Sequence, residues 1–280
     1  MNIEKTKIVA DSSADVTELD GIDFASTPLK IITAEKQYVD NESLNVEKMV
    51  ADLRSYNGRS STSCPNADDW ITTFGDAENV FCVTITGTLS GSYNSATTAK
   101  QIYEEEHPGS RVFVIDSLST GPEIALIIEK LRELITNGKD FDTVCKEITE
   151  YTKQTGLLFM LESMKNLANN GRVSPLVAKM VGLLDIRVIG KASDRGDLEP
   201  LNKCRGEKKA LDTIVKHLKE LGLRSGKVKI AHCLNESAAL SLKELIRKEL
   251  GKLQIDVYAC RGLCSFYAEK GGLLIGFEKS

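Results

Sequence analysis

The chain has 280 residues, of which 41% are hydrophobic and 27% are charged, and its formal net charge is −4. This length suits one large domain or two ordinary ones, and the composition is that of a soluble globular protein. A net charge this small, without a long basic block, argues against nucleic acid as the main partner. No apolar stretch has the length of a signal peptide or a membrane-spanning helix, so membrane insertion is not expected.

The first half of the chain alternates strand-like and helix-like segments. Short β-rich apolar runs predict strands at residues 6–10, 23–33, 80–85 and 111–117. Apolar residues at helical spacing predict helices at residues 45–57, 95–106, 122–137 and 141–155. A loop at Pro65 leads into a further helix, with Trp70 and Phe74 on its apolar face. Strands separated by helices of this length predict a parallel, doubly wound α/β sheet.

The second half mixes hairpins with strand–helix units. After apolar runs at 157–164 and 177–188, the sequence predicts a hairpin at 189–201, helices at 208–221 and 236–250, and strands at 228–233, 254–259 and the final GGLLIGFE. This pattern predicts a second α/β domain with a mixed sheet. We expect the two domains to comprise residues 1–160 and 161–280.

The seven cysteines are scattered along the chain, and several lie inside apolar runs, where cysteine behaves as a small buried hydrophobe. No pair has CxxC spacing. The closest two, Cys260 and Cys264, lack a matching second pair or a nearby histidine, so no metal site is predicted. A reduced, cytoplasmic protein is the simplest interpretation.

Three segments are rich in hydroxyl groups, and each is expected where a strand meets a loop or a helix: DSSAD at 11–15, STSCP at 61–65 and TGTLSGS at 86–92. In open parallel sheets, ligands bind beyond the carboxyl ends of the strands. The three segments are therefore predicted to converge on one site, although they lie far apart in the sequence.

TGTLSGS is the most suggestive of these segments, because it leads from a strand into a helix. The first N–H groups of a helix have no internal partner, and glycine lets a ligand approach the backbone closely. Ser90 and Ser92 add hydroxyl donors, so the segment suits a phosphate or a carboxylate. It matches neither the Walker A loop nor GxGxxG. A plain capped helix start explains the same residues, because serine and threonine are common N-caps.

Eight short motifs in order give the chain a resemblance to the DegV family. They are DSSAD at 11–15, Pro28–Leu29, TSCP at 62–65, LSGSYNSA at 89–96, VIDS at 114–117, NGRVS at 170–174, LLDIRVI at 183–189 and KCRGEKKAL at 203–211. The resemblance implies a two-domain α/β protein that holds a fatty acid in a cleft between its domains. It also implies the lipid-binding subunit of a bacterial fatty acid kinase: a non-catalytic protein with a kinase partner and no cofactor besides the bound fatty acid.

The resemblance also implies which residues form the site. The fatty acid carboxylate would lie near Thr62, Ser63, Ser90, Gly91 and Ser92. The pocket mouth, or a surface that docks the kinase, would comprise Ser12, Ser13, Arg172 and Arg205. The basic run that contains Arg205 is more simply explained as a solvated surface, and docking of the kinase rests on the resemblance.

One departure from the family pattern concerns the head group. The family commonly ends with a histidine followed by a Gly-Pro-Gly turn, whereas this chain has YACRGLCSFYAEKGG at 258–272. Arg261 lies about where the histidine would be. A guanidinium is a fixed cation with five donors, whereas an imidazole changes charge near neutral pH. Arg261 is therefore expected either to pair with the carboxylate or to form a surface salt bridge.

An alkyl tail would supply most of the affinity. Burying one CH₂ group contributes about 0.8 kcal/mol, so a chain of about 16 carbons contributes on the order of 12 kcal/mol before the costs of association. Core packing is the default role of every apolar candidate for the tail pocket. The candidates are Leu29, Ile31, Leu126, Ile127, Leu158, Phe159, Leu161, Met164, Met180 and Leu184.

Two other functions use the same pocket. An α/β hydrolase or small-molecule phosphotransferase could draw a triad from Ser90, His232 and Asp116, but Ser90 is not in a GxSxG elbow and nothing places His232 beside it. A structural role for His232 is the simpler interpretation. A carrier of another small anion would have a pocket too short for an alkyl tail. The carboxylates of DSSAD could bind a metal, but a capped turn accounts for them more simply.

Overall fold

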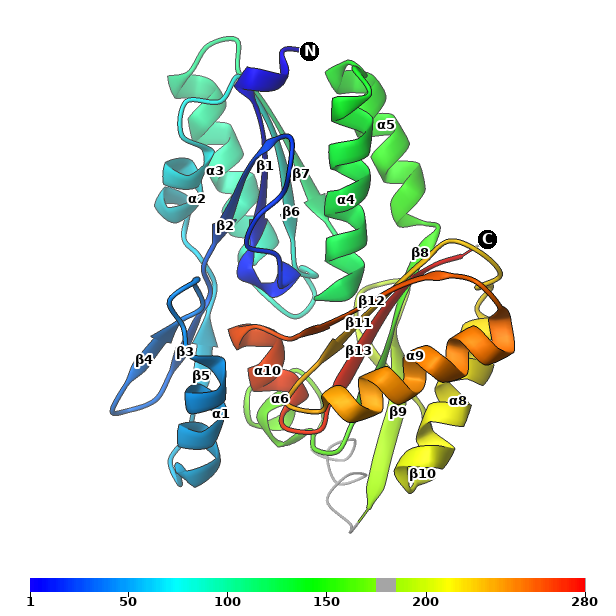
Figure 1. Ribbon diagram of the computed structural model, residues 1–280. Coiled ribbons are helices and arrows are strands. Elements are labelled where there is room, and N and C mark those ends of the chain that lie inside the picture. Colours follow the sequence, from blue (N-terminus) through cyan, green and yellow to red (C-terminus); the bar gives the residue numbers. More distant parts are fainter. Residues whose placement is uncertain (175–184, 280) are drawn as a thin grey trace.

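The computed structural model describes residues 1–174 and 185–279, which form two lobes (Figure 1). The N-terminal lobe contains a four-stranded, fully parallel sheet in the order β2-β1-β6-β7. Its strands are β1 (Thr6–Asp11), β2 (Asp23–Thr27), β6 (Asn79–Thr84) and β7 (Arg111–Asp116). Every residue of β6 is buried, as expected for a central parallel strand that is covered on both faces.

Helices cover both faces of this sheet. They are α2 (Ala67–Phe74), α3 (Ser92–Glu106), α4 (Pro122–Thr136) and α5 (Phe141–Thr152). Val9 and Cys82 pack with α2 and α3, whereas the neighbouring residues Ile8 and Phe81 pack with α4 and α5. This two-sided packing confirms the predicted doubly wound sheet. The predicted loop at Pro65 also leads into α2, whose Asn66 and Asp69 form a capping box.

The second lobe contains a six-stranded mixed sheet in the order β10-β9-β8-β13-β11-β12. Its strands are β8 (Thr155–Leu161), β9 (Ile186–Ala192), β10 (Leu198–Arg205), β11 (Lys227–His232), β12 (Gln254–Ala259) and β13 (Leu273–Glu278). Only β11 and β12 pair in parallel, so the predicted mixed sheet and the predicted hairpin are confirmed. One face packs against α8 (Glu207–Glu220) and α9 (Glu236–Leu250). The other face receives α4 from the first lobe.

The chain passes from one sheet to the other between Thr152 and Thr155, because β8 already belongs to the mixed sheet. A boundary after residue 160 would divide this strand. We therefore propose that the domain boundary lies in the connection between α5 and β8.

The strand predicted at 23–33 is divided into two strands. The first is β2, and the second belongs to a small antiparallel sheet with the order β4-β3-β5. It comprises β3 (Lys30–Ile32), β4 (Gln37–Val39) and β5 (Ser61–Ser63). The predicted strand is interrupted at Pro28, which has no N–H to donate to a sheet. This sheet and α1 (Val46–Ser55) extend beside α10 (Gly262–Ala268), a short helix that the sequence analysis did not predict (Figure 1).

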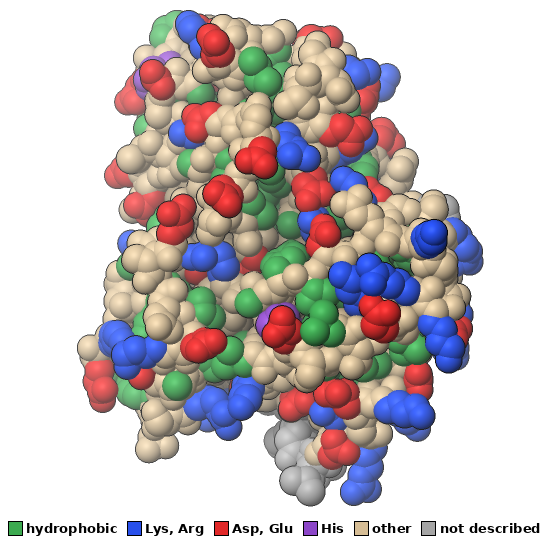
Figure 2. Space-filling view, in the orientation of Figure 1, with side chains coloured by type: hydrophobic (Ala, Val, Ile, Leu, Met, Phe, Trp, Pro, Cys, Tyr) green, Lys and Arg blue, Asp and Glu red, His purple; other side chains and the backbone are tan. Residues whose placement is uncertain are grey.

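The remaining described elements are short: η1 (Ile3–Lys5), η2 (Ser12–Ala14) and α6 (Lys165–Asn169). Most of the apolar run at 177–188 lies outside the described residues, and its last three residues begin β9. On the surface shown in Figure 2, acidic and basic side chains are interspersed over both lobes, so this face presents mixed charge.

Candidate functional site

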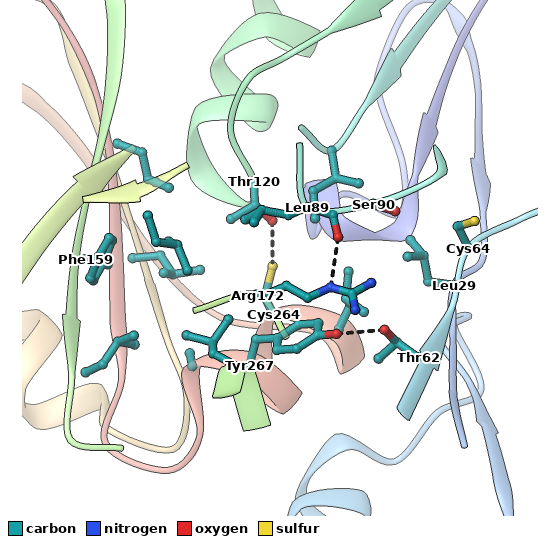
Figure 3. Close-up of a pocket in the computed structure, with 18 of the residues that line it drawn as sticks. Leu29, Thr62, Cys64, Leu89, Ser90, Thr120, Phe159, Arg172, Cys264 and Tyr267 are labelled. Carbon is teal, nitrogen blue, oxygen red and sulfur yellow. Dashed lines mark hydrogen bonds between the residues drawn. The ribbon is translucent and has the colours of Figure 1, made fainter. Parts of the chain in front are cut away.

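A cavity of about 340 Å³ lies between the two lobes (Figure 3). Its volume falls within the range of about 300–1,000 Å³ that is typical of small-molecule sites. The first lobe contributes residues of β5 and residues that follow the ends of β2, β5, β6 and β7. The second lobe contributes residues of β8, β10, β13, α6 and α10, together with Arg172 after α6. The carboxyl edge of the parallel sheet therefore forms one side of the cavity, as the sequence predicted for a ligand site.

Strand β8 forms much of the apolar wall. Leu157, Phe159 and Leu161 line the cavity, whereas Leu158 and Met160 pack against the helices on the opposite face of the sheet. Side chains alternate between the two faces of a strand, so three odd-numbered positions point to one side. The lining is completed by leucines from other elements, which makes it mostly apolar.

Polar side chains gather at one end of the cavity. The hydroxyl groups of Thr62 and Tyr267 lie 2.7 Å apart, and the Arg172 Nε donates to the Leu89 carbonyl oxygen at 3.0 Å. Ser90 follows Leu89 in the same loop and also lines the cavity. Figure 3 shows Thr62, Ser90 and the Arg172 guanidinium on one side of the site and Phe159 on the other. Four segments far apart in the sequence thus build a polar end opposite an apolar one.

These groups can donate hydrogen bonds to an anion. The Ser90 Oγ accepts a bond from the Ser92 backbone N–H at 3.2 Å, so its own hydrogen can be donated to a ligand. Only one of the two hydroxyl groups of Thr62 and Tyr267 donates the hydrogen bond between them, so the hydrogen of the other hydroxyl can point into the cavity. Burial raises the pKa of Tyr267, so its phenol is neutral at physiological pH. Arg172 adds a permanent positive charge.

A buried carboxylate fixes the loop that carries Ser90. The Asp11 Oδ1 accepts from the backbone N–H and the hydroxyl of Ser13, at 3.2 and 2.5 Å. Its Oδ2 accepts from the Ile85 N–H at 2.9 Å and the Ser92 hydroxyl at 2.6 Å. Burial raises the pKa of Asp11, and these hydrogen bonds act in the opposite direction. Asp11 therefore ties the ends of β1 and β6 to the start of α3.

A second buried carboxylate positions α10, which presents Tyr267 to the cavity. The two oxygens of Asp40 accept from the Gly262 and Leu263 N–H groups, each at 2.8 Å. A Cβ atom at position 262 would lie 2.6 Å from the Asp40 Oδ1, so glycine is required for this close approach. Asp40 thus satisfies donors at the N-terminus of α10 that have no partner within the helix.

The residues proposed for a hydrolase triad are not assembled. The His232 Nδ1 accepts from the Asn235 N–H at 3.4 Å, and burial lowers the pKa of His232. Asp116 accepts from the Gly87 and Leu118 N–H groups. Neither His232 nor Asp116 lines the cavity that contains Ser90. The arrangement suits binding of an amphipathic ligand with one anionic end.

A family model described as "uncharacterised protein, DegV family" matches residues 5–279. The chain belongs to the DegV family. A DegV domain-containing protein of Streptococcus pneumoniae is 45% identical over 276 residues, which cover 97% of this chain and 98% of that protein.

Two solved structures of the family are closely similar to this one. A DegV family protein from Eubacterium eligens, loaded with heptadecanoic acid, has a TM-score of 0.97 and 42% identity, and the match covers 98% of this chain and 100% of that one. The Streptococcus pneumoniae Fatty Acid Kinase (Fak) B3 protein, loaded with linoleic acid, has a TM-score of 0.96 and 44% identity, with coverage of 98% and 99%. The family's α/β fold, with one parallel and one mixed sheet, is therefore the fold of this chain.

The structure brings five of the predicted site residues into the cavity lining: Thr62, Ser63, Ser90, Gly91 and Arg172. Arg172, which is predicted at the pocket mouth or on a docking surface, lies beside Leu89 at the polar end of the cavity.

The other predicted site residues have different environments. Ser13 and Ser92 donate their hydroxyl groups to Asp11 and are buried, and the Ser12 Oγ accepts from the Leu29 N–H at 3.0 Å. Ser92 does not line the cavity, so its contact with a carboxylate stays a prediction. Arg205 ends β10 on the surface, away from the cavity lining.

Arg261 is also absent from the lining. Its guanidinium donates to the Asn41 carbonyl oxygen and its backbone N–H donates to Asp15 at 2.9 Å. Within residues 1–174 and 185–279 this guanidinium forms no salt bridge with an aspartate or a glutamate, and its pairing with a fatty acid carboxylate stays a prediction. Tyr267, which is not among the predicted site residues, is the residue of this C-terminal stretch that reaches Thr62. Its only sequence signal was an aromatic residue with a hydroxyl group near the expected histidine.

The candidates for the tail pocket divide in a similar way. Leu29, Phe159 and Leu161 line the cavity. Five others pack in the protein core instead: Ile31, Leu126, Ile127, Leu158 and Met164. Met180 and Leu184 lie outside the described residues.

Membrane-spanning helices and metal-binding clusters are both absent from residues 1–174 and 185–279. No helix there has the length and apolar character needed to cross a membrane. No cluster of three or more histidine, cysteine, aspartate or glutamate side chains in the described ranges could hold a metal ion.

Proposed function

We propose that this protein binds a long-chain fatty acid in the cavity between its lobes. The observation that carries this proposal is the division of one cavity into a polar end, with hydroxyl groups and a guanidinium, and an apolar wall built on β8. The two relatives that were solved with heptadecanoic acid and linoleic acid support it.

The proposed carboxylate site comprises Thr62, Ser63, Ser90, Arg172 and Tyr267, with the backbone of Gly91 beside them. Hydrogen bonds from neutral hydroxyl groups to a carboxylate are charge-assisted, and the guanidinium adds electrostatic attraction. The alkyl chain would then extend along Phe159 and the other apolar lining residues. Its burial supplies most of the affinity, and the polar end sets the direction in which the chain binds.

The proposed role is that of a non-catalytic subunit that presents the fatty acid carboxylate to a partner kinase, with no cofactor besides the bound acid. The name of the similar Streptococcus pneumoniae protein, a fatty acid kinase B protein, supports this role. We propose that the protein acts in the cytoplasm. All seven of its cysteines are free thiols, which fits a reducing compartment.

Lipid extraction and native mass spectrometry of the purified protein test the binding proposal. A retained long-chain acid, displaced by added oleic acid at a stoichiometry of one, is the expected result. If the protein retains no acid and takes up none after delipidation, the proposal is wrong. Turnover of an ester or phosphate ester that is abolished by Ser90→Ala would instead indicate a hydrolase or phosphotransferase.

A reconstituted kinase assay tests the proposed role. With a fatty acid kinase catalytic subunit and ATP, acyl phosphate should form only when the loaded protein is present. Acyl phosphate formed by this protein alone would contradict the non-catalytic role. We also propose that exposed Arg205, at the end of β10, belongs to the surface that docks the kinase. Arg205→Glu should then lower the rate at limiting protein concentration and leave fatty acid binding unchanged.

A further inference from the structure

The apolar part of the cavity contains a polar interruption. Thr120 and Cys264 both line the cavity, and the Thr120 Oγ1 lies 3.6 Å from the Cys264 Sγ. In Figure 3 these two side chains lie between the Phe159 end and the end that holds Thr62 and Ser90. The proposed carboxylate site does not use them. A hydroxyl group in an alkyl-binding wall is unfavourable unless it has a hydrogen-bond partner.

The hydrogen bond of Thr120 within the protein is weak. The Cys264 thiol donates its single hydrogen to the Ser13 carbonyl oxygen at 3.3 Å. Its sulfur is therefore the acceptor for the Thr120 hydroxyl, and sulfur is a poor acceptor. The Thr120 oxygen keeps its own acceptor positions. A ligand oxygen in the cavity would be a better partner than the sulfur, either as donor or as acceptor.

A second polar group lies behind the same part of the wall. The Asp15 side chain is buried, and its Oδ2 has no hydrogen-bond partner among the described residues. This oxygen and the Cys264 Sγ both lie against Gly121: a Cβ atom built there would be 3.7 Å from the first and 3.5 Å from the second. Burial raises the pKa of Asp15 to about 8, so a neutral, protonated carboxyl group stands behind the thiol.

We propose that Thr120, backed by Cys264, forms a subsite for an oxygen substituent on the alkyl chain. The ligand class is hydroxylated long-chain fatty acids that carry the hydroxyl group part-way along the chain. This inference rests on the proposed function. It adds a specificity-determining residue: the distance from the carboxylate end to Thr120 selects which carbon carries the hydroxyl group, and the hydrogen bond replaces the hydration that the substituent loses on burial.

A series of positional isomers tests the subsite without any variant. Octadecanoic acid and the positional isomers of hydroxyoctadecanoic acid, each with a single hydroxyl group at one of the successive even-numbered carbons, are titrated into the delipidated protein. One isomer, or two neighbouring ones, should bind about as tightly as octadecanoic acid, and the others should bind at least roughly tenfold more weakly because their hydroxyl group is buried without a partner. Equal affinities across the series would overturn the proposal.

Thr120→Val then identifies the partner. This nearly isosteric change should weaken the favoured isomer relative to octadecanoic acid by roughly three- to tenfold, and Thr120→Ser should restore the ratio. Thr149→Val is the matched control, because its exposed hydroxyl donates to the Cys145 carbonyl oxygen on α5, away from the cavity. An unchanged ratio in Thr120→Val would also overturn the subsite. If octadecanoic acid itself does not bind, the proposed function fails; a flat series with tight octadecanoic acid binding refutes the subsite alone.

Discussion

At the scale of single residues, the hydroxyl groups of this chain serve two purposes that the sequence does not separate. Ser13 and Ser92 hold the strand ends by donating to Asp11, whereas Thr62 and Ser90 face the cavity. Asp11 and Ser92 are 81 positions apart, so no local pattern reveals their contact. Two of the three hydroxyl-rich segments therefore line the cavity, whereas no residue of DSSAD does, and the role of each serine depends on tertiary contacts.

Tyr267→Phe tests the polar end. Removing the phenol oxygen deprives Thr62 of its partner and keeps the packing of the ring, so fatty acid binding should weaken by roughly three- to tenfold. Isothermal titration of the delipidated protein measures this. Tyr103→Phe is the control, because the Tyr103 hydroxyl donates to the Ala77 carbonyl oxygen at 2.8 Å on the side of the parallel sheet that α2 and α3 cover. This variant should lose stability and keep its affinity for the fatty acid. Equal effects on affinity would refute the assignment.

Asp15→Asn tests a pH dependence of stability. Burial, reinforced by the nearby Asp40 charge, raises the pKa of Asp15 from 3.8 to about 8 in the folded protein. Folding therefore favours the protonated form: this contribution is complete below pH 3.8 and is lost as the pH rises to about 8. Asparagine cannot ionise, and it tolerates the left-handed backbone at this position. The variant should gain stability relative to the wild type between pH 4 and 8 in urea titrations, and a constant difference would contradict the shift.

At the scale of elements, the predictions succeeded where the hydrophobic pattern was long. Helix α9 and strand β12 have the predicted bounds, and α4 differs by one residue. The small sheet and α10 were missed, because strands of three residues and a helix of seven are too short for a periodic pattern. Because α10 carries Tyr267 and Cys264, the lack of a periodic pattern there also left these two cavity residues unpredicted.

Asp40→Ala tests how α10 supports the site. Two N–H groups at the start of α10 would lose their acceptor, so both the free energy of unfolding and fatty acid affinity should fall, the former by about 1–3 kcal/mol. Asp140→Ala removes a comparable cap from α5, where Asp140 accepts from the Thr143 N–H at 3.0 Å. This control should lower stability alone. Denaturant unfolding and ligand titration on both variants distinguish the two effects, and unchanged affinity in Asp40→Ala would refute the link.

At the scale of the whole molecule, charged groups join the two lobes. Glu129 on α4 contacts Lys229 at 2.5 Å and Lys227 at 3.1 Å, both on β11. The Lys229 side chain is only 8% exposed and also pairs with Asp256. A buried ion pair is costly to break, because removing one partner leaves a charge in a poor solvent. These contacts hold the helix of one lobe against the sheet of the other and thereby fix the walls of the cavity.

Glu129→Gln should therefore destabilise the protein by about 1–3 kcal/mol, which is less than for an isolated buried pair because Lys229 keeps Asp256. Glu133→Gln, one helical turn away, removes only an exposed pair with Lys130 and should change stability by less than about 0.5 kcal/mol. Chemical denaturation of both variants provides the comparison. Equal losses would show that Glu129 does not join the lobes in this way.

Alternate residues of β8 have different roles, because they lie on opposite faces of the mixed sheet. Leu158 and Met160 seal the helical side, whereas Leu157, Phe159 and Leu161 shape the space offered to a ligand. Replacements at the odd-numbered positions can therefore change which length and shape of fatty acid fits the cavity. The residues at the even-numbered positions maintain the packing of the sheet against its helices. Among homologues that bind different acids, sequence differences should therefore be concentrated at the cavity-facing positions of β8 and should be few at the positions that face the helices.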